Sequence, residues 1–254
     1  MKLIYSLLIL LVIVSCAEDT SSESNITEPQ KNKKSPTVEQ MFTRQAEAEL
    51  GIPANENYTS SIYIEELNGD DSLDYIFTVN RLEYALNKAI EKGNIAQRAE
   101  MGYTGKYNYF FYMDGATKEI SAAIPVASSP HSPLEVSFEN VKTEAYKDIL
   151  VDFRIRNSKF RKYLSVTRKI PFETFEMMVF DGLGTAEAKA FSFEYGRGSY
   201  SLSKDILIYK AYMENIEIND PMDIYKANPK IESTGELDRL WFFNDNQNKY
   251  FTKK

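Results

Sequence analysis

Beyond residue 38 the chain carries its apolar residues in many short runs, separated by Gly, Pro, Asn, Asp and Ser. The run at 107–112 is apolar on both faces, as in a central strand, and the Asp114-Gly115 pair after it is typical of a hairpin turn. Short runs between turn residues predict β-strands. We expect strands at 75–77, 107–112, 119–126, 134–139, 148–155, 160–166, 174–180, 189–195, 205–212, 239–243 and 249–252.

Two segments have the apolar spacing of a helix. In residues 37–50, Thr37 and Gln40 have the spacing of a capping box, and Gly51 marks the expected end. The second segment is 81–92. Many short strands with few helices predict an α+β fold, mainly antiparallel β, with two or three helices near the N-terminus of the mature domain. We see no place to divide 38–254, so we expect a single globular domain there.

The first sixteen residues have a different character from the rest. Lys2 lies near their start, and residues 3–14 form an apolar run that only Tyr5 and Ser6 interrupt. This run is shorter than the roughly 20 residues that cross a bilayer, and it suits the apolar region of a signal peptide. We therefore expect residues 1–15 to be a cleaved signal peptide.

The last four of these residues, Ile13-Val14-Ser15-Cys16, resemble the lipobox of bacterial lipoproteins. The resemblance implies cleavage before Cys16, acylation of its sulfur and new amino group, and a membrane partner reached through those acyl chains. In this family an Asp after the cysteine favours the inner membrane, so Ala17 favours the outer membrane. The alternative is a buried cysteine in an ordinary signal peptide.

Composition limits the remaining possibilities. Residues 16–37 comprise the lipidated cysteine and a polar stretch with one strongly apolar residue, Ile26, so a flexible tether is expected. Cys16 is the only cysteine, which excludes disulfides and Cys-ligated metal sites within one mature chain. The net charge of −7 argues against a nucleic-acid partner, because phosphate binding depends on Lys and Arg.

An acidic loop at 66–74 precedes the apolar run at 75–77. Its alternate side-chain oxygens suit calcium, which takes oxygen ligands. The loop resembles the calcium loops of FG-GAP and VCBS-type β-propeller repeats, and this implies calcium as a cofactor. The implied ligands are Glu66, Asn68, Asp70 and Asp74. Glu66 stands where Asp is usual, and Asp71 where Gly is usual. The alternative is that these Asp residues end turns before buried strands.

Two further segments share part of this pattern. Residues 140–151 align Asp148 with Asp74, but Lys142 then falls on the position of Asn68 and argues against a metal. Residues 203–208 repeat the pattern of 146–151 around Asp205. The three aspartates are unequally spaced, so we do not expect strict repeats.

A basic stretch without acidic residues spans 153–170. It indicates a patch for an anionic partner, such as phosphorylated lipid headgroups, acidic glycans or another envelope protein. The patch residues are Arg154, Arg156, Lys159, Arg161 and Lys162. The alternative is the solvated face of a hairpin, paired across strands with acidic residues.

Few motifs indicate catalysis. His131 is the only histidine and lies in a Pro/Ser-rich stretch, which excludes sites built on two or more imidazoles in one chain. The sequence contains neither a P-loop nor a G-x-S-x-G motif. Two carboxylates brought together by folding leave no motif, so glycoside hydrolysis stays open.

The aromatic residues near the C-terminus allow two interpretations. Trp241 with Tyr250 could form a platform for sugar rings, or Trp241, Phe243 and Phe251 could close the core. We therefore expect a lipid-anchored cell-envelope protein with a soluble, non-catalytic binding or structural domain, whose partner is an envelope protein or a glycan. The alternative is a surface glycan-binding protein or a carboxylate-type glycoside hydrolase.

Overall fold

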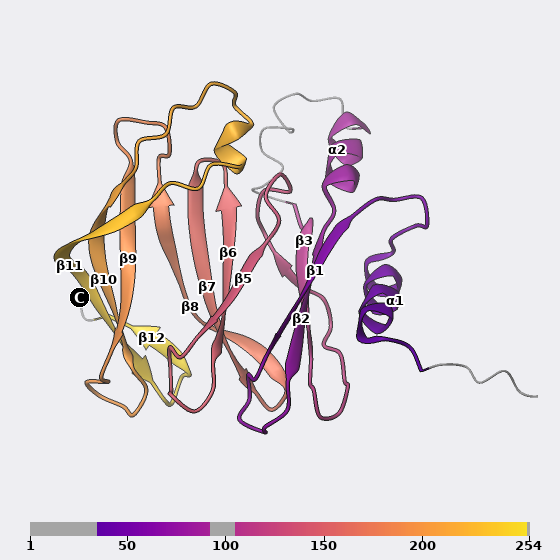
Figure 1. Cartoon of the computed structure of the whole chain (residues 1–254), viewed down its shortest axis with the longest axis horizontal. Coiled ribbons are helices and arrows are strands. Elements are labelled where there is room, and N and C mark those ends of the chain that lie inside the picture. Colours follow the sequence, from indigo (N-terminus) through magenta and orange to yellow (C-terminus); the bar gives the residue numbers. More distant parts are fainter. Residues whose placement is uncertain (1–34, 92–104, 253–254) are drawn as a thin grey trace, which may run out of the picture. The chain divides into compact units, whose positions relative to one another are not determined.

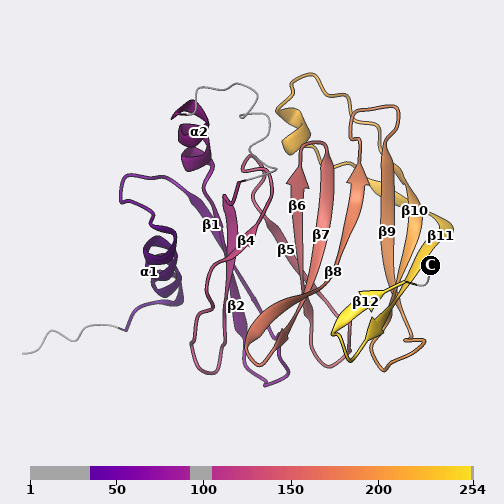
Figure 2. The ribbon, with the colours of Figure 1, turned by 180° about the vertical axis from the view of Figure 1, so that it is seen from behind.

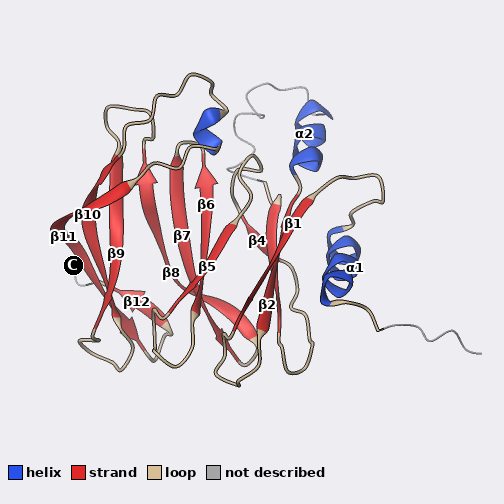
Figure 3. Ribbon diagram, in the orientation of Figure 1, coloured by secondary structure: helices blue, strands red, loops and turns tan. Residues whose placement is uncertain are grey.

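The computed structural model describes residues 35–91 and 105–252, which form antiparallel sheets with two α-helices (Figure 3). The expected signal peptide, Cys16 and nearly all of the expected tether lie outside the described residues. The helices are α1 (Val38–Leu50), α2 (Leu82–Glu91) and the short 3₁₀ helix η1 (Asp223–Tyr225). Neither α-helix of the described residues has the length and apolar character that a membrane span requires.

The strands form two sheets in which each strand pairs with its neighbours in the chain (Figure 1). The four-stranded sheet contains β1 (Thr59–Glu65), β2 (Asp74–Asn80), β3 (Asn108–Met113) and β4 (Ile124–Val126). The eight-stranded sheet contains β5 (Glu135–Glu139), β6 (Asp148–Ile155), β7 (Ser158–Thr167), β8 (Ile170–Asp181), β9 (Lys189–Gly196), β10 (Asp205–Met213), β11 (Ile231–Asn244) and β12 (Lys249–Phe251). The expectation of a mainly antiparallel β fold is confirmed.

The start of α1 is as the sequence predicts. The Thr37 hydroxyl accepts from the backbone N–H of Gln40, and the Gln40 side chain accepts from the backbone N–H of Thr37. Gly51 ends the helix with φ 59°, a left-handed conformation that suits glycine. The second α-helix lies where expected, but β1 and β2 precede it, so the helices are not grouped at the start of the domain. Strand β1 was not expected, because its sequence begins Thr-Ser-Ser and its residues are largely exposed.

The four-stranded sheet is covered on both faces. On one face Phe42 of α1 stacks on Phe77 of β2, with ring centroids 5.1 Å apart. On the other face Ile76 and Phe110 share a buried cluster with β6 and β7 residues such as Ile149 and Leu164. Both faces of β2 and β3 are therefore buried, which explains their continuous apolar sequences.

The eight-stranded sheet is divided between β8 and β9. These strands pair only through Phe180 with Ala190 and Asp181 with Lys189. Side chains from both halves, among them Tyr163 of β7 and Phe243 of β11, then pack into one core cluster. Figure 2 shows β5–β8 and β9–β12 as the two groups of strands that this seam joins.

A buried ion pair fixes the region between α1 and β2. Arg81 is 5% exposed, and its guanidinium donates twice to Glu56, at 2.6 and 2.7 Å. The same guanidinium donates to the carbonyl of Leu50 at the end of α1, at 3.0 Å. Because the two charges are removed from water together, loss of one partner leaves the other uncompensated.

We predict that Arg81→Met destabilises the protein by about 3–5 kcal/mol, the range for breaking a buried pair. That change lowers the melting temperature by roughly 10 °C in a domain of this size. Thermal denaturation followed by circular dichroism measures it. Lys88→Met removes an exposed i,i+3 pair with Glu91 and should leave the melting curve unchanged. Equal melting temperatures for the Arg81 variant and the wild type would contradict this role.

Candidate functional site

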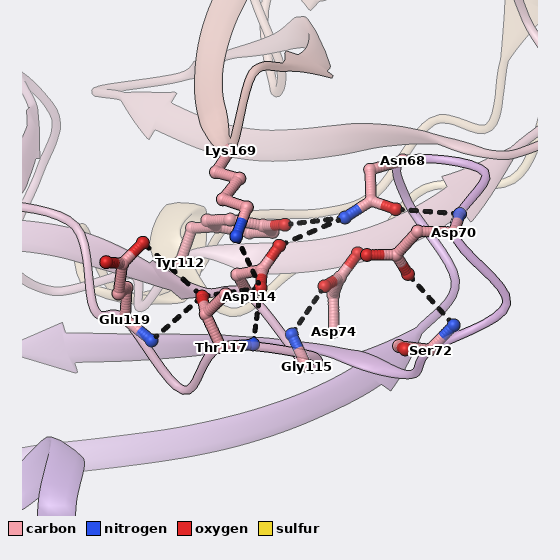
Figure 4. A network of polar contacts seen from close by, with 10 residues as sticks. All are labelled: Asn68, Asp70, Ser72, Asp74, Tyr112, Asp114, Gly115, Thr117, Glu119 and Lys169. Atoms are coloured by element: carbon pink, nitrogen blue, oxygen red, sulfur yellow. Dashed lines mark hydrogen bonds and ion pairs between the residues drawn. The ribbon is translucent and has the colours of Figure 1, made fainter.

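The acidic loop of the sequence folds around the carboxylate of Asp74, the first residue of β2 (Figure 4). Asp74 is fully buried. Its Oδ2 accepts from the backbone N–H of Leu67 at 3.2 Å, and its Oδ1 accepts from the N–H of Gly115 at 2.8 Å. A Cβ at position 115 would lie 2.0 Å from the carbonyl oxygen of Leu73, so only glycine fits this approach. The carboxylate thus joins the loop at 66–73 to the turn after β3.

The other three expected calcium ligands each use a side-chain oxygen to accept from a backbone N–H of their own loop. Glu66 accepts from the backbone N–H groups of Asn68 and Gly69. Asn68 Oδ1 accepts from the N–H of Asp70 at 3.0 Å. Asp70 Oδ1 in turn accepts from the N–H of Ser72 at 2.9 Å. These are successive side-chain turns, the arrangement by which Asx residues replace backbone hydrogen bonds. Asp71 has φ 61°, so an Asp adopts the left-handed conformation that Gly usually takes.

A second buried carboxylate, Asp114, lies beside this loop (Figure 4). Asn68 donates from Nδ2 to the Tyr112 hydroxyl and to Asp114, both at 3.3 Å. Asp114 also accepts from the backbone and hydroxyl of Thr117, and Lys169 Nζ lies 3.4 Å from it. From the sequence, Asp114 is predicted only as a turn residue. Its partners come from three separate segments, and no local pattern reveals them.

Burial affects the two carboxylates differently. Desolvation raises the pKa of Asp74, against the opposing effect of its hydrogen bonds from Gly115, Tyr112 and Leu67. Desolvation also acts to raise the pKa of Asp114, but the bonds from Thr117 and the charge of Lys169 outweigh it, and the pKa is lowered. Asp114 is therefore held as a carboxylate by its donors and by a cation, while Asp74 depends on neutral donors alone.

The same arrangement occurs at Asp148 and Asp205, the two aspartates that share part of the sequence pattern. Asp148 begins β6 and accepts from the backbone N–H of Lys142 at 2.7 Å and from the Ser165 hydroxyl. Asp205 begins β10 and accepts from the N–H and hydroxyl of Ser199. Each is 2% exposed. In all three cases a buried Asp at the start of a strand holds the loop that precedes it.

The three loops held in this way contact one another in sequence. Glu65, the last residue of β1 and directly before the first loop, forms an ion pair of 2.6 Å with Lys147 of the second loop. The backbone N–H of Lys204 donates to the carbonyl of Lys142, at 3.1 Å, between the second and the third. The carbonyl of Lys204 then accepts from the hydroxyl of Tyr250 in β12. Figure 1 shows these loops at the lower edge of the sheets, so one edge carries a continuous row of them.

Calcium at Glu66, Asn68, Asp70 and Asp74 stays a prediction. Each of the four side chains has at least one oxygen that already accepts from a backbone N–H. Within residues 35–91 and 105–252, no three His, Cys, Asp or Glu side chains are grouped so that they could hold a metal ion. These hydrogen bonds favour the alternative, in which the acidic residues form turns ahead of a buried strand.

Thermal melts of the full chain in EDTA and in a few millimolar calcium chloride test the two roles. Calcium bound at about a hundred times its Kd adds roughly 2.7 kcal/mol and raises the melting temperature by several degrees. Because the oxygens are already occupied by N–H donors, we expect superimposable curves. A calcium-dependent rise that Asp70→Asn reduces would contradict the structural role and establish the metal site.

Burial also gives Asp148 a measurable pH dependence. Desolvation raises its pKa, against the lowering effects of Ser165 and Lys142. A carboxyl whose pKa rises on folding stabilises the protein fully below its unfolded value of about 3.9, and this contribution is lost as the pH rises through the folded pKa.

We predict that Asp148→Asn costs about 1–3 kcal/mol at pH 7, because one buried donor loses its acceptor. The stability of the wild type relative to this variant should increase as the pH falls from 7 towards 4. Urea denaturation at several pH values measures both effects. Glu187→Gln, at an exposed residue, is the control for the loss of one surface charge. A constant difference between the wild type and Asp148→Asn would show that Asp148 does not titrate in this range.

The basic stretch lies on β6, β7 and the turn between them, and most of its cations have partners inside the domain. Arg154 is 3% exposed and donates to the carbonyls of Ile224 and Ala227, which holds the η1 segment against β6. Asp152 receives Arg161 at 2.6 Å and Lys159 at 3.2 Å.

The remaining members of the basic stretch are placed differently. Lys162 pairs with Glu173 and Glu176 of β8. Arg156 lies in the β6–β7 turn with φ 53°, outside the strand that carries Arg154. Burial acts to lower the pKa of Arg161, but the adjoining Asp152 carboxylate outweighs it and the pKa is raised. These contacts support the alternative of cross-strand pairing, and an anionic-partner patch stays a prediction.

An aromatic hollow of about 490 Å³ lies at the C-terminal hairpin. Its lining comprises Tyr200, Phe242, Phe243, Asn244, Asp245, Asn246 and Phe251. Trp241 and Tyr250, the expected sugar platform, instead belong to the core, where Phe175 packs against both. Phe251, an expected core residue, is 39% exposed. The alternation along β11 and β12 places Phe242 and Phe251, which are paired across the strands, on the other face.

His131 lies by a second, mainly apolar groove of about 440 Å³ that α2 and the 130–133 segment line. Its ring packs on Tyr225, with centroids 5.1 Å apart, and burial lowers its pKa. The side chains of Asn80 and Asn108 fix the adjoining segment through the carbonyls of Pro130 and Ser129. These contacts support a structural role for His131, which packs on Tyr225 beside a segment that Asn80 and Asn108 fix.

No known family model, no curated protein and no solved structure matches the chain.

Proposed function

We propose that the chain is a lipid-anchored protein of the cell envelope, held in a membrane through acylated Cys16, whose domain of residues 38–254 binds a partner and does not catalyse a reaction. The lipobox-like residues 13–16 support the anchor, and Ala17 favours the outer membrane. The helix that opens the domain begins at Val38, soon after the polar stretch, so the proposed tether would lead directly into folded structure.

The observation that carries the binding role is the use of the buried carboxylates. Asp74, Asp148 and Asp205 each accept from backbone N–H groups of the loop before their strand. A carboxylate glycosidase needs one acid and one base or nucleophile that face a cleft, roughly 5–9 Å apart. Carboxylates directed at the protein's own backbone support a structural role for these residues, and this favours binding over catalysis.

The anchor is tested by metabolic labelling with an alkyne analogue of palmitate. The wild type should incorporate label and partition with membranes, while Cys16→Ser should incorporate none and remain uncleaved or soluble, because the acylated sulfur is absent. Ser15→Ala keeps the cysteine and serves as the control that should label normally. Equal labelling of the wild type and Cys16→Ser would contradict the anchor.

A further inference from the structure

We propose that the aromatic hollow at the C-terminal hairpin is a binding site for a neutral glycan chain. The inference rests on the proposed function, since it names the class of partner that the domain binds. Tyr200 and Phe251 provide the stacking surfaces, and the Asn244–Asn246 turn provides the polar groups.

The first support is the exposure of aromatic rings that the core does not use. Tyr200 is 65% exposed and Phe251 39% exposed. The Tyr200 ring packs edge to face against the half-buried Phe242 ring, with centroids 4.9 Å apart at 83°. Sugar rings present an apolar face of C–H groups and a polar rim of hydroxyls, so they suit a ring surface bordered by amides and a carboxylate.

The second support is that the loop carrying Tyr200 is fixed before any ligand arrives. Ser199 next to it donates twice to the buried Asp205. A Cβ at Gly198 would lie 2.0 Å from the carbonyl oxygen of Ser203, so the loop closes tightly on itself. Rigid loops lose little conformational entropy on binding, which increases affinity for a small contact area.

The third support is the polar border of the hollow. Asn244 Oδ1 accepts from the backbone N–H groups of Asn246 and Gln247, so the turn has a defined shape. Asp245 and Asn246 are exposed at the hollow. A volume of about 490 Å³ falls within the 300–1,000 Å³ that is typical of small-ligand sites.

Charge selects a neutral glycan over an acidic one or a lipid surface. Among residues 35–91 and 105–252, the only ionisable residue other than tyrosine in the lining is Asp245, and the chain carries a net charge of −7. Both repel acidic polysaccharides and anionic headgroups. A bilayer-inserting surface would also lack an amide and carboxylate border, because those groups lose water on insertion.

The test uses the full acylated chain in detergent, on native gels that contain hydroxyethylcellulose or galactomannan as neutral polymers, or alginate as an acidic one. We expect a neutral polymer to retard the wild type. Tyr200→Ala and Phe251→Ala should each raise the Kd about tenfold, the loss typical of a central aromatic anchor. Tyr200→Phe keeps the ring and should bind normally. Tyr212→Ala removes a 74% exposed tyrosine on β10, outside the hollow, and is the matched control.

Three results would overturn the proposal. They are no retardation of the wild type by either neutral polymer, equal retardation of the wild type and Tyr200→Ala, and retardation by alginate alone. Circular dichroism of each variant checks that it is folded. If the alanine variants fail to fold, the comparison of Tyr200→Phe and Tyr200→Leu decides, since both fill the position and only one keeps an aromatic face.

A labelled variant separates glycan from membrane and tests the anchor as well. Asn246→Cys adds one thiol to a chain whose only other cysteine is Cys16. With an environment-sensitive dye at this position, emission should be the same in detergent and in phosphatidylcholine liposomes, and should shift when the retarding polymer is added. A blue shift in liposomes alone would indicate bilayer docking and overturn the glycan site. Two dyes on each chain would show that the Cys16 thiol is free and not acylated. That result would contradict the anchor and would leave the glycan result unaffected.

Discussion

A carboxylate can leave water only if hydrogen-bond donors replace its hydration, and this requirement organises much of the domain. Asp74, Asp148 and Asp205 begin β2, β6 and β10, and each accepts one backbone N–H from the loop before its strand. Asp205 receives its donors on Oδ2, and its buried Oδ1 has no hydrogen-bond partner among the described residues. The same bonds satisfy N–H groups that the loops would otherwise leave unpaired. Loop and strand are therefore fixed together, and the neighbouring loops can pack against one another in a continuous row.

This row explains how three loops with only partly similar sequences reach the same local structure. The three segments are not repeats of a domain. In each of them a buried Asp at the start of a strand accepts from the loop before it, at a different position along the sheets. The row ends at the C-terminal hairpin, where the Tyr250 hydroxyl reaches the loop that carries Tyr200. The loop that carries the exposed Tyr200 is therefore held by the same kind of hydrogen bonds that hold the loops before β2 and β6.

Local signals in the sequence were reliable where the residues themselves supply the interaction. The capping box at Thr37 and Gln40 is an example, since both partners lie within one turn of chain. The strand β1 was missed because its polar residues gain their order from pairing with β2 and not from burial of their own. The acidic loop was ambiguous for a different reason. Oxygens at alternate positions suit both a cation and a series of side-chain turns, and only the positions of the N–H groups distinguish them.

The aromatic residues near the C-terminus show a third limit of prediction from sequence, which is the register of a strand. Trp241, Phe242 and Phe243 are consecutive, and a shift of one residue exchanges the buried and exposed members. The polar residues of this segment do not fix the choice, because Arg239 has the alternation of Trp241 and Phe243, while Asn244 has that of Phe242. Phe243 is buried through its pairing with Tyr250, which is itself held by Lys204. The face that carries Phe242 and Phe251 therefore depends on a contact with a loop some forty residues earlier in the chain.

The pairing of every strand with its neighbour in the chain has a consequence for how the protein acquires its structure. Most of these hairpins close a short segment; the exceptions are β2–β3, which α2 separates, and β10–β11, which η1 separates. The loss of chain entropy at most steps is therefore small, and folding can advance along the chain as successive hairpins add to a growing edge. The seam between β8 and β9, with its two residue pairs, interrupts this progress. We therefore expect the polypeptide to fold in two kinetic stages, with β9–β12 docking after the preceding strands have formed.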